Sequence, residues 1–187
     1  MVSGLPRSGT SMLMGMIAAG GLQPVVDGLR EADEDNPKGY HELEQVKQLD
    51  TDGDSGWLDD ARGKVVKVIS FLLRHLPETH HYKIVFVRRD LQEVLASQRT
   101  MLERRGESGG DADDDAMARM FAAHLGKVER ELAGRKNCAV LYVDHRAAMA
   151  DPATVAAQVN SFLGGGLDVA RMAAVVDDRL YRNRAAS

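Results

Sequence analysis

The chain has 187 residues, of which 44% are hydrophobic, and a formal net charge of -4. These values predict one globular domain spanning 1–187, and they argue against general nucleic-acid binding, which needs a strongly basic surface. No apolar stretch is as long as a membrane span, and the single cysteine, Cys138, excludes an internal disulfide. We therefore expect no membrane span and a cytoplasmic location.

Apolar runs with strand spacing and helix spacing alternate along the chain. The predicted strands are 1–3, 64–70, 83–87 and 139–143. The predicted helices are 11–19, 42–49, 91–104, 116–132 and 152–163. This alternation predicts an α/β protein with a doubly wound, mostly parallel sheet of four to five strands and helices on both faces. Ligands of such sheets bind at the carboxyl ends of the strands.

The first predicted strand leads into a glycine-bounded turn with the spacing of a phosphate-binding loop. The turn is Gly4-Leu5-Pro6-Arg7-Ser8-Gly9-Thr10-Ser11. Backbone N–H groups of such a loop and the start of the next helix hold an anion together. Thr10 stands where the ATP-binding loop has lysine, so a triphosphate would be poorly neutralised, whereas Arg7 offers a planar fork for phosphate or sulfonate. A signal peptide is the competing interpretation, but its cleavage would remove the strand and the turn.

The segment from Pro6 to Ser11 resembles the 5'-phosphosulfate loop of sulfotransferases that use 3'-phosphoadenosine 5'-phosphosulfate (PAPS). Arg89 follows the strand 83–87, and Ser97 lies on the next helix at the spacing of the family's 3'-phosphate motif. Leu91 stands where the family often has proline. The resemblance implies a P-loop nucleoside triphosphate hydrolase-like fold and PAPS as the sulfonate donor, without a metal. It assigns cofactor binding to Pro6, Arg7, Ser8, Gly9, Thr10, Ser11, Arg89 and Ser97.

Sulfonate transfer needs a base for the acceptor proton and positive charge near the transferred group. Residues 36–42 resemble the stretch that carries a carboxylate base in many bacterial sulfotransferases, which makes Glu42 our candidate base and His41 the alternative. Glu42 is equally compatible with a helix-start carboxylate that complements the helix dipole. Lys67 stands among four apolar residues of a predicted strand, so we expect it to have a partner and to point its ammonium at the sulfonate. Arg7 completes the candidate catalytic set.

Two alternatives to a sulfotransferase stay open: a nucleotide kinase or other phosphotransferase on the same loop, and a non-catalytic nucleotide-binding protein. The acceptor class is equally open, since a small molecule, a glycan or a lipid with a hydroxyl or amine would serve. The glycine-rich, acidic segment 104–115 predicts a mobile loop over the acceptor or a plain solvated connection. The basic tail 179–184 is either solvated or replaces the late Arg-Lys-Gly loop of larger cytosolic sulfotransferases, a triplet that this chain lacks.

Overall fold

The computed structural model describes residues 1–28, 41–51, 55–104, 106 and 114–177. Most of the predicted connection 104–115, the whole basic tail 179–184, and residues 36–40 before the candidate base lie outside these residues.

A small parallel sheet forms the centre of the molecule. It contains β1 (Val2–Gly4), β2 (Tyr82–Arg88) and β3 (Cys138–Asp144) in the order β1-β2-β3. Both strand pairs are parallel, with Gly4 opposite Val87 and Arg88 opposite Asp144. Three of the predicted strands are therefore confirmed within one or two residues, and the α/β class is confirmed with them.

The fourth predicted strand, 64–70, is wrong as a continuous strand. This stretch makes only isolated bridges, Val2 to Lys67 and Pro24 to Val65, and a 3-10 helix, η2 (Ser70–His75), begins at its end. β1 is only three residues long, so the stretch 64–70 has little strand to pair with. The two segments share backbone hydrogen bonds from Val2 N to Val66 O at 2.9 Å and from Val68 N to Val2 O at 3.0 Å. A sheet of four to five strands is thus not confirmed.

Four predicted helices are confirmed. They are α1 (Thr10–Ala19), α3 (Leu91–Arg104), α4 (Asp114–Gly134) and α6 (Pro152–Leu163). The predicted helix 42–49 is instead a 3-10 helix, η1 (Glu44–Asp50), in which only Val46 is buried. A segment with so little buried apolar surface lacks the packing that stabilises most α-helices. Three short helices were not predicted: α2 (Trp57–Asp60), α5 (His145–Ala150) and α7 (Val169–Ala173).

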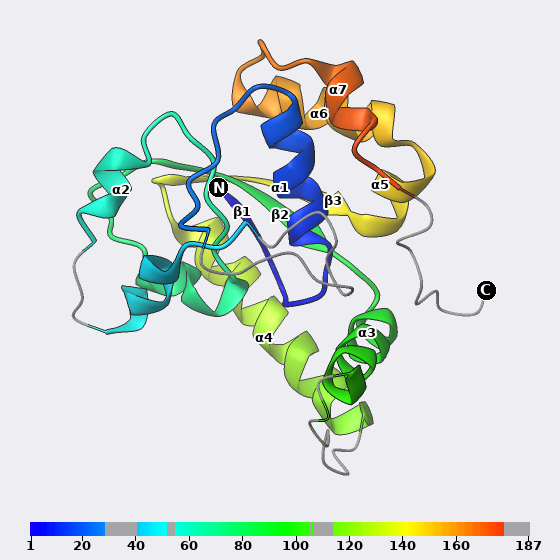
Figure 1. The fold of residues 1–187 in the computed structure, drawn as a ribbon. Coiled ribbons are helices and arrows are strands. Elements are labelled where there is room, and N and C mark those ends of the chain that lie inside the picture. Colours follow the sequence, from blue (N-terminus) through cyan, green and yellow to red (C-terminus); the bar gives the residue numbers. More distant parts are fainter. Residues whose placement is uncertain (29–40, 52–54, 105, 107–113, 178–187) are drawn as a thin grey trace.

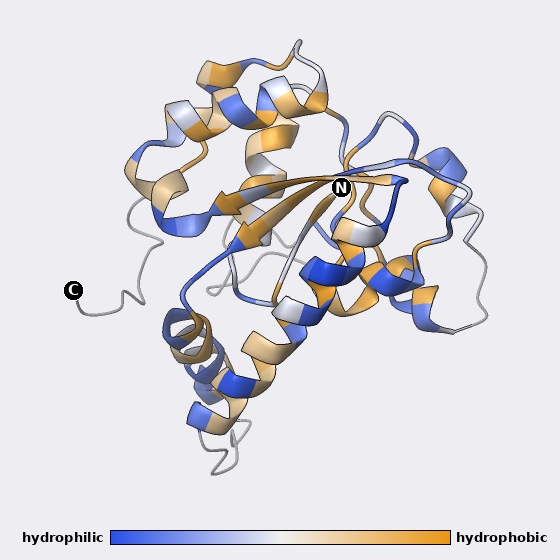
Figure 2. Cartoon of the chain, turned by 180° about the vertical axis from the view of Figure 1, so that it is seen from behind, coloured by the Kyte–Doolittle hydropathy of each residue, from blue (hydrophilic) through white to orange (hydrophobic). Residues whose placement is uncertain are grey.

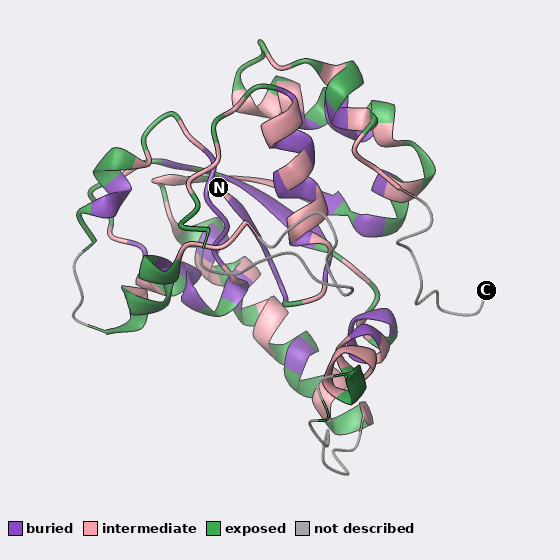
Figure 3. Ribbon diagram, in the orientation of Figure 1, coloured by how far each residue is buried: buried purple, intermediate pink, exposed green. Residues whose placement is uncertain are grey.

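Helices cover both faces of the sheet, as expected (Figure 1). Val85 and Val87 of β2 pack with α1, α6 and α7, whereas Ile84 and Phe86 pack with α4 and η2. This alternation is the two-residue period of a strand that is buried on both faces. Figure 2 shows β2 and β3 as strongly hydrophobic ribbons. In Figure 3, β1 and β2 are mostly buried, whereas β3 is mostly of intermediate burial.

The parallel arrangement brings three chain reversals to one edge of the sheet. β1 ends at Gly4, β2 at Arg88 and β3 at Asp144. The predicted phosphate loop, Arg89 and the start of α5 therefore follow neighbouring strand ends. None of the helices in the described part of the chain is long and apolar enough to cross a membrane.

Candidate functional site

The loop between β1 and α1 is a tight turn whose backbone requires glycine at both ends. Gly4 and Gly9 have φ angles of 152° and 102°, and Arg7 between them has φ 65°. A Cβ atom on Gly4 would lie 2.8 Å from the carbonyl oxygen of Val87. Ser8 closes the turn, since its backbone N–H and its hydroxyl both donate to Leu5 O, at 3.2 Å and 2.7 Å. The local sequence therefore folds into the compact turn that its glycine spacing predicts.

The remaining loop residues differ in what they present. Pro6 is exposed, and Thr10 is buried with its methyl group near Gly4. Ser11, on the first turn of α1, lies 3.4 Å from the Lys67 ammonium. Gly9 is the N-cap of α1, so the amino end of this ten-residue helix opens onto the loop. That end carries the positive part of the helix dipole.

His145, which sequence reasoning missed, packs against the loop from the end of β3. A Cβ atom on Gly9 would lie 2.5 Å from His145 Cδ2, so only glycine leaves room for the imidazole. The residue is 6% exposed. Burial, followed by the charge of Arg89, lowers the pKa of His145 to about 4, so the ring is neutral at neutral pH.

The predicted 3'-phosphate residues are adjacent to the loop. Arg89 Nη1 donates to the backbone carbonyl of Arg7 at 3.0 Å, and Arg7 Nε donates to Ser97 Oγ at 3.1 Å. Ser97 is buried on α3. The structure thus brings together Arg7, Arg89 and Ser97, which come from three segments. It also turns the Arg7 guanidinium toward Ser97.

A buried carboxylate joins this group to the end of β3. Glu93 Oε2 accepts from Arg89 Nε at 3.0 Å, and Glu93 Oε1 accepts from Arg146 Nη2 at 3.3 Å. The Glu93 side chain is 2% exposed. We call Arg7, Arg89, Glu93, Ser97 and Arg146 the arginine cluster. The spacing of Arg89 and Glu93, four residues apart at a helix start, was a usable sequence signal for the pair, whereas nothing local pointed to Arg146.

Three of the four candidate catalytic residues, His41, Glu42 and Lys67, form a second group near the start of α1, whereas Arg7 belongs to the arginine cluster. Lys67 Nζ lies 3.2 Å from Glu42 Oε1 and is itself buried. The Glu42 side chain is 30% exposed. Lys67 was expected to have a partner, and that partner is Glu42. Because Lys67 also lies next to Ser11, it connects the Glu42 carboxylate to the predicted phosphate loop.

His41 belongs to the same group. Its Nε2 atom would be 3.9 Å from a Cβ atom on Gly15 of α1, and its backbone φ is 50°. Burial, followed by the charge of Lys67, lowers the pKa of His41. We call Ser11, His41, Glu42 and Lys67 the lysine cluster.

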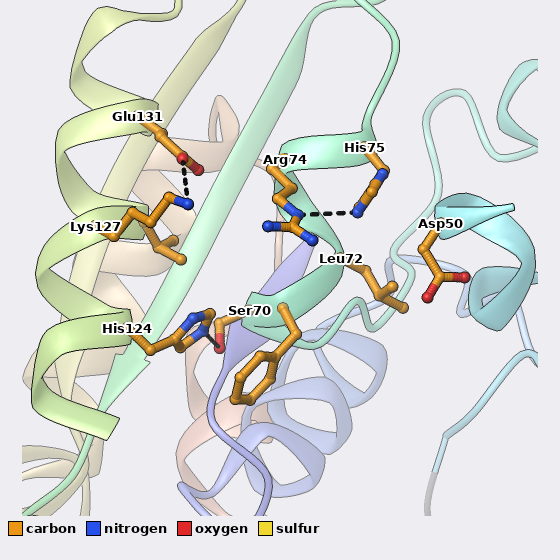
Figure 4. Close-up of a pocket in the computed structure, with 10 residues that line it drawn as sticks. Asp50, Ser70, Leu72, Arg74, His75, His124, Lys127 and Glu131 are labelled. Atoms are coloured by element: carbon orange, nitrogen blue, oxygen red, sulfur yellow. Dashed lines mark hydrogen bonds and ion pairs between the residues drawn. The ribbon is translucent and has the colours of Figure 1, made fainter. Parts of the chain in front are cut away.

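A pocket lies on the α4 side of the sheet (Figure 4). None of the residues that line it belongs to the arginine cluster or the lysine cluster. Its wall includes His124 of α4, which shares a 2.9 Å hydrogen bond with Ser70 and stacks on Phe71 with ring centroids 3.8 Å apart. Burial lowers the pKa of His124. These contacts give His124 a packing role.

No group of three or more His, Cys, Asp or Glu side chains that could hold a metal ion occurs among the residues that the structure describes. Comparison with protein-family models and with curated proteins gave no match for this chain.

Proposed function

We propose that the chain is a sulfotransferase that moves the sulfonate group of PAPS to a hydroxyl or amine acceptor. One observation carries the proposal: the predicted phosphate loop and the Arg89–Ser97 pair meet at one edge of the sheet, where Arg7 contacts residues 82 and 90 positions away in sequence. A nucleotide that carries phosphate at both its 5' and 3' positions presents two anionic groups, and this edge offers a backbone cradle beside a pair of guanidiniums. Guanidinium forks bind such oxygen clusters well.

On the 5' side, backbone N–H groups of the loop and the amino end of α1 would hold the phosphosulfate, with the Ser11 hydroxyl as a further donor. On the 3' side, Arg89 and Ser97 would hold the phosphate. Arg7 belongs to the loop by its backbone and to the 3' side by its hydrogen bond to Ser97. The cation beside Glu42 is Lys67.

In the transfer step, Glu42 accepts the proton of the acceptor hydroxyl or amine while the acceptor atom forms a bond to sulfur. The bond between sulfur and the 5'-phosphate oxygen breaks, and 3',5'-adenosine bisphosphate leaves with the bonding electrons. Lys67 neutralises the charge that develops on that leaving oxygen, the kind of electrostatic assistance on which group transfer relies. His41 is the alternative base, because its lowered pKa keeps the imidazole neutral and able to accept a proton.

A phosphotransferase is the second candidate, and a specific contact favours it. Lys67 Nζ reaches Ser11 from a different segment, so an ammonium lies near the loop although the loop itself lacks the usual lysine. Such a cation could meet a nucleoside triphosphate with its magnesium ion.

Isothermal titration calorimetry distinguishes these functions. We expect 3',5'-adenosine bisphosphate to bind without magnesium and much more tightly than AMP. Equal affinities for the two nucleotides would remove the 3'-phosphate argument, and a preference for ATP with magnesium would favour the phosphotransferase. Tight binding without turnover of PAPS on any hydroxyl, amine, glycan or lipid acceptor would leave a nucleotide-binding protein.

A further inference from the structure

We propose that Arg146 is a second arginine of the 3'-phosphate site and that Glu93 is the residue that positions Arg146 and Arg89 there. This inference rests on the proposed function. It assigns roles to two residues that neither the loop motif nor the Arg89–Ser97 spacing includes.

Glu93 is placed to orient both side chains at once. Its two carboxylate oxygens accept from different guanidiniums, Oε2 from Arg89 and Oε1 from Arg146, at 3.0 Å and 3.3 Å. The carboxylate is almost fully buried. A buried carboxylate is costly without charged partners, so it fixes the positions of the cations that satisfy it.

The two cations come from different strand ends. Arg89 follows β2, and Arg146 lies on α5, which follows β3 (Figure 1). Asp144 caps α5 by accepting from Ala147 N at 2.8 Å, which sets where the helix begins. Asp144 pairs with Arg88 in the ladder between β2 and β3, so it lies at the same edge of the sheet as the end of β2. Arg146 therefore reaches Glu93 from a rigid support and not from a loose loop.

The side chains of Arg89 and Arg146 differ in how much of their surface is exposed to solvent. The Arg89 side chain is 9% exposed, whereas that of Arg146 is 60% exposed although one nitrogen is held by Glu93. The Arg146 side chain is therefore accessible to a ligand that approaches from solvent, whereas Arg89 lies in the interior. A planar guanidinium suits a phosphate ligand, because its N–H donors form a fixed fork.

The arginine cluster gathers the kind of cations that bind a phosphate monoester. It contains the guanidiniums of Arg7, Arg89 and Arg146 around the carboxylate of Glu93. A phosphate monoester carries about -1.5 to -2 at neutral pH. Ser97 and its hydroxyl lie one helical turn beyond Glu93 on the same face of α3. A terminal phosphate that reached Ser97 would thus lie beside the Arg7 guanidinium and one helical turn from the carboxylate that holds Arg89 and Arg146.

The test compares 3',5'-adenosine bisphosphate with AMP, which differ in the 3'-phosphate alone. Calorimetry on Arg146→Ala should show affinity for the bisphosphate reduced roughly ten- to a hundredfold, with affinity for AMP unchanged. Arg146→Lys, which keeps the charge and loses the fork, should fall between wild type and Arg146→Ala. Arg171→Ala, at an exposed arginine of α7 that pairs with Asp168, is the matched control and should match wild type.

Glu93→Gln keeps the size of the side chain and removes its charge, so it should lower the preference for the bisphosphate over AMP without changing the AMP affinity. A merely structural Glu93 would lower both affinities together, which overturns its positioning role. If Arg89→Ala abolishes the preference for the bisphosphate and Arg146→Ala does not change it, the inference fails and the proposed function stands. If the wild-type protein shows no preference, both fail.

Discussion

The arginine cluster and the lysine cluster each include a residue of the same loop, Arg7 and Ser11, and differ in how they hold their carboxylates. Glu93 is buried between two guanidiniums, whereas Glu42 keeps a side-chain exposure of 30% and pairs with the Lys67 ammonium. A buried carboxylate that accepts from two guanidiniums fixes those cations in place. A partly exposed carboxylate is accessible to a substrate and can accept a proton from it. In the proposed function, the first cluster therefore binds the nucleotide and the second carries out the transfer.

The largest effect expected from this division concerns Glu42. Glu42→Gln removes the basicity and keeps the size, so turnover should fall about a hundred- to ten-thousandfold, the usual worth of a general base. Affinity for 3',5'-adenosine bisphosphate should stay at the wild-type value, because the arginine cluster is untouched. Steady-state kinetics with calorimetry on the same samples checks both. Turnover near the wild-type rate would move the base to His41.

The converse change is Arg89→Ala. Loss of a charge-assisted fork should weaken binding of 3',5'-adenosine bisphosphate by about 2–4 kcal/mol, while the rate at saturating PAPS changes far less. Arg88→Ala is the matched control, because the neighbouring Arg88 pairs with Glu129 of α4 instead of joining the cluster. If the two variants bind the nucleotide equally well, Arg89 has no role in the site.

Because His145 is neutral in the folded protein, it makes the stability of the fold depend on pH. The pKa of His145 is lowered to about 4 in the folded protein, from an ordinary value near 6.5, so between these values the unfolded chain binds a proton that the folded chain does not. Stability should therefore fall as pH falls from about 6.5 to 4, by up to about 3 kcal/mol from this residue. Urea unfolding of wild type and His145→Gln across this range measures the difference. Parallel pH profiles for the two proteins would contradict the assignment.

The smallest expected effect tests whether the cap of α5 helps to position Arg146. Asp144→Ala removes the cap of α5 and should cost about 1 kcal/mol of stability. Asp151→Ala removes the cap of α6 in the same way and should cost a similar amount. Only the first helix carries Arg146, so only Asp144→Ala should also reduce the preference for 3',5'-adenosine bisphosphate over AMP. Thermal unfolding and calorimetry on both variants make the comparison, and equal preferences would separate α5 from the site.

The sequence was sufficient where the information was local. The glycine spacing of the loop, the apolar runs of β2 and β3, and the periodicity of α3, α4 and α6 each predict the element that forms. The stretch 64–70 misled because its β-branched residues favour a strand, while the three-residue β1 beside it limits pairing to isolated bridges. Tertiary context commonly overrides strand propensity in this way.

The candidate site shows the same limit more sharply. Lysine among apolar residues indicated that Lys67 has a partner, and Glu42 is that partner. His145 and Arg146 could not be identified, because their contacts with Gly9 and Glu93 depend on the register of β3 against β2. Nothing within a few residues of them encodes that register.

The left-handed backbone of Arg7 has a consequence for protein engineering. At φ 65° a residue with a side chain is held at a cost of roughly 1 kcal/mol, whereas glycine adopts this conformation readily. A thermostability screen that ignored ligand would therefore tend to enrich Arg7→Gly, and in doing so would remove the guanidinium that the loop presents to Ser97. Selection for heat resistance and selection for nucleotide binding would pull this position in opposite directions.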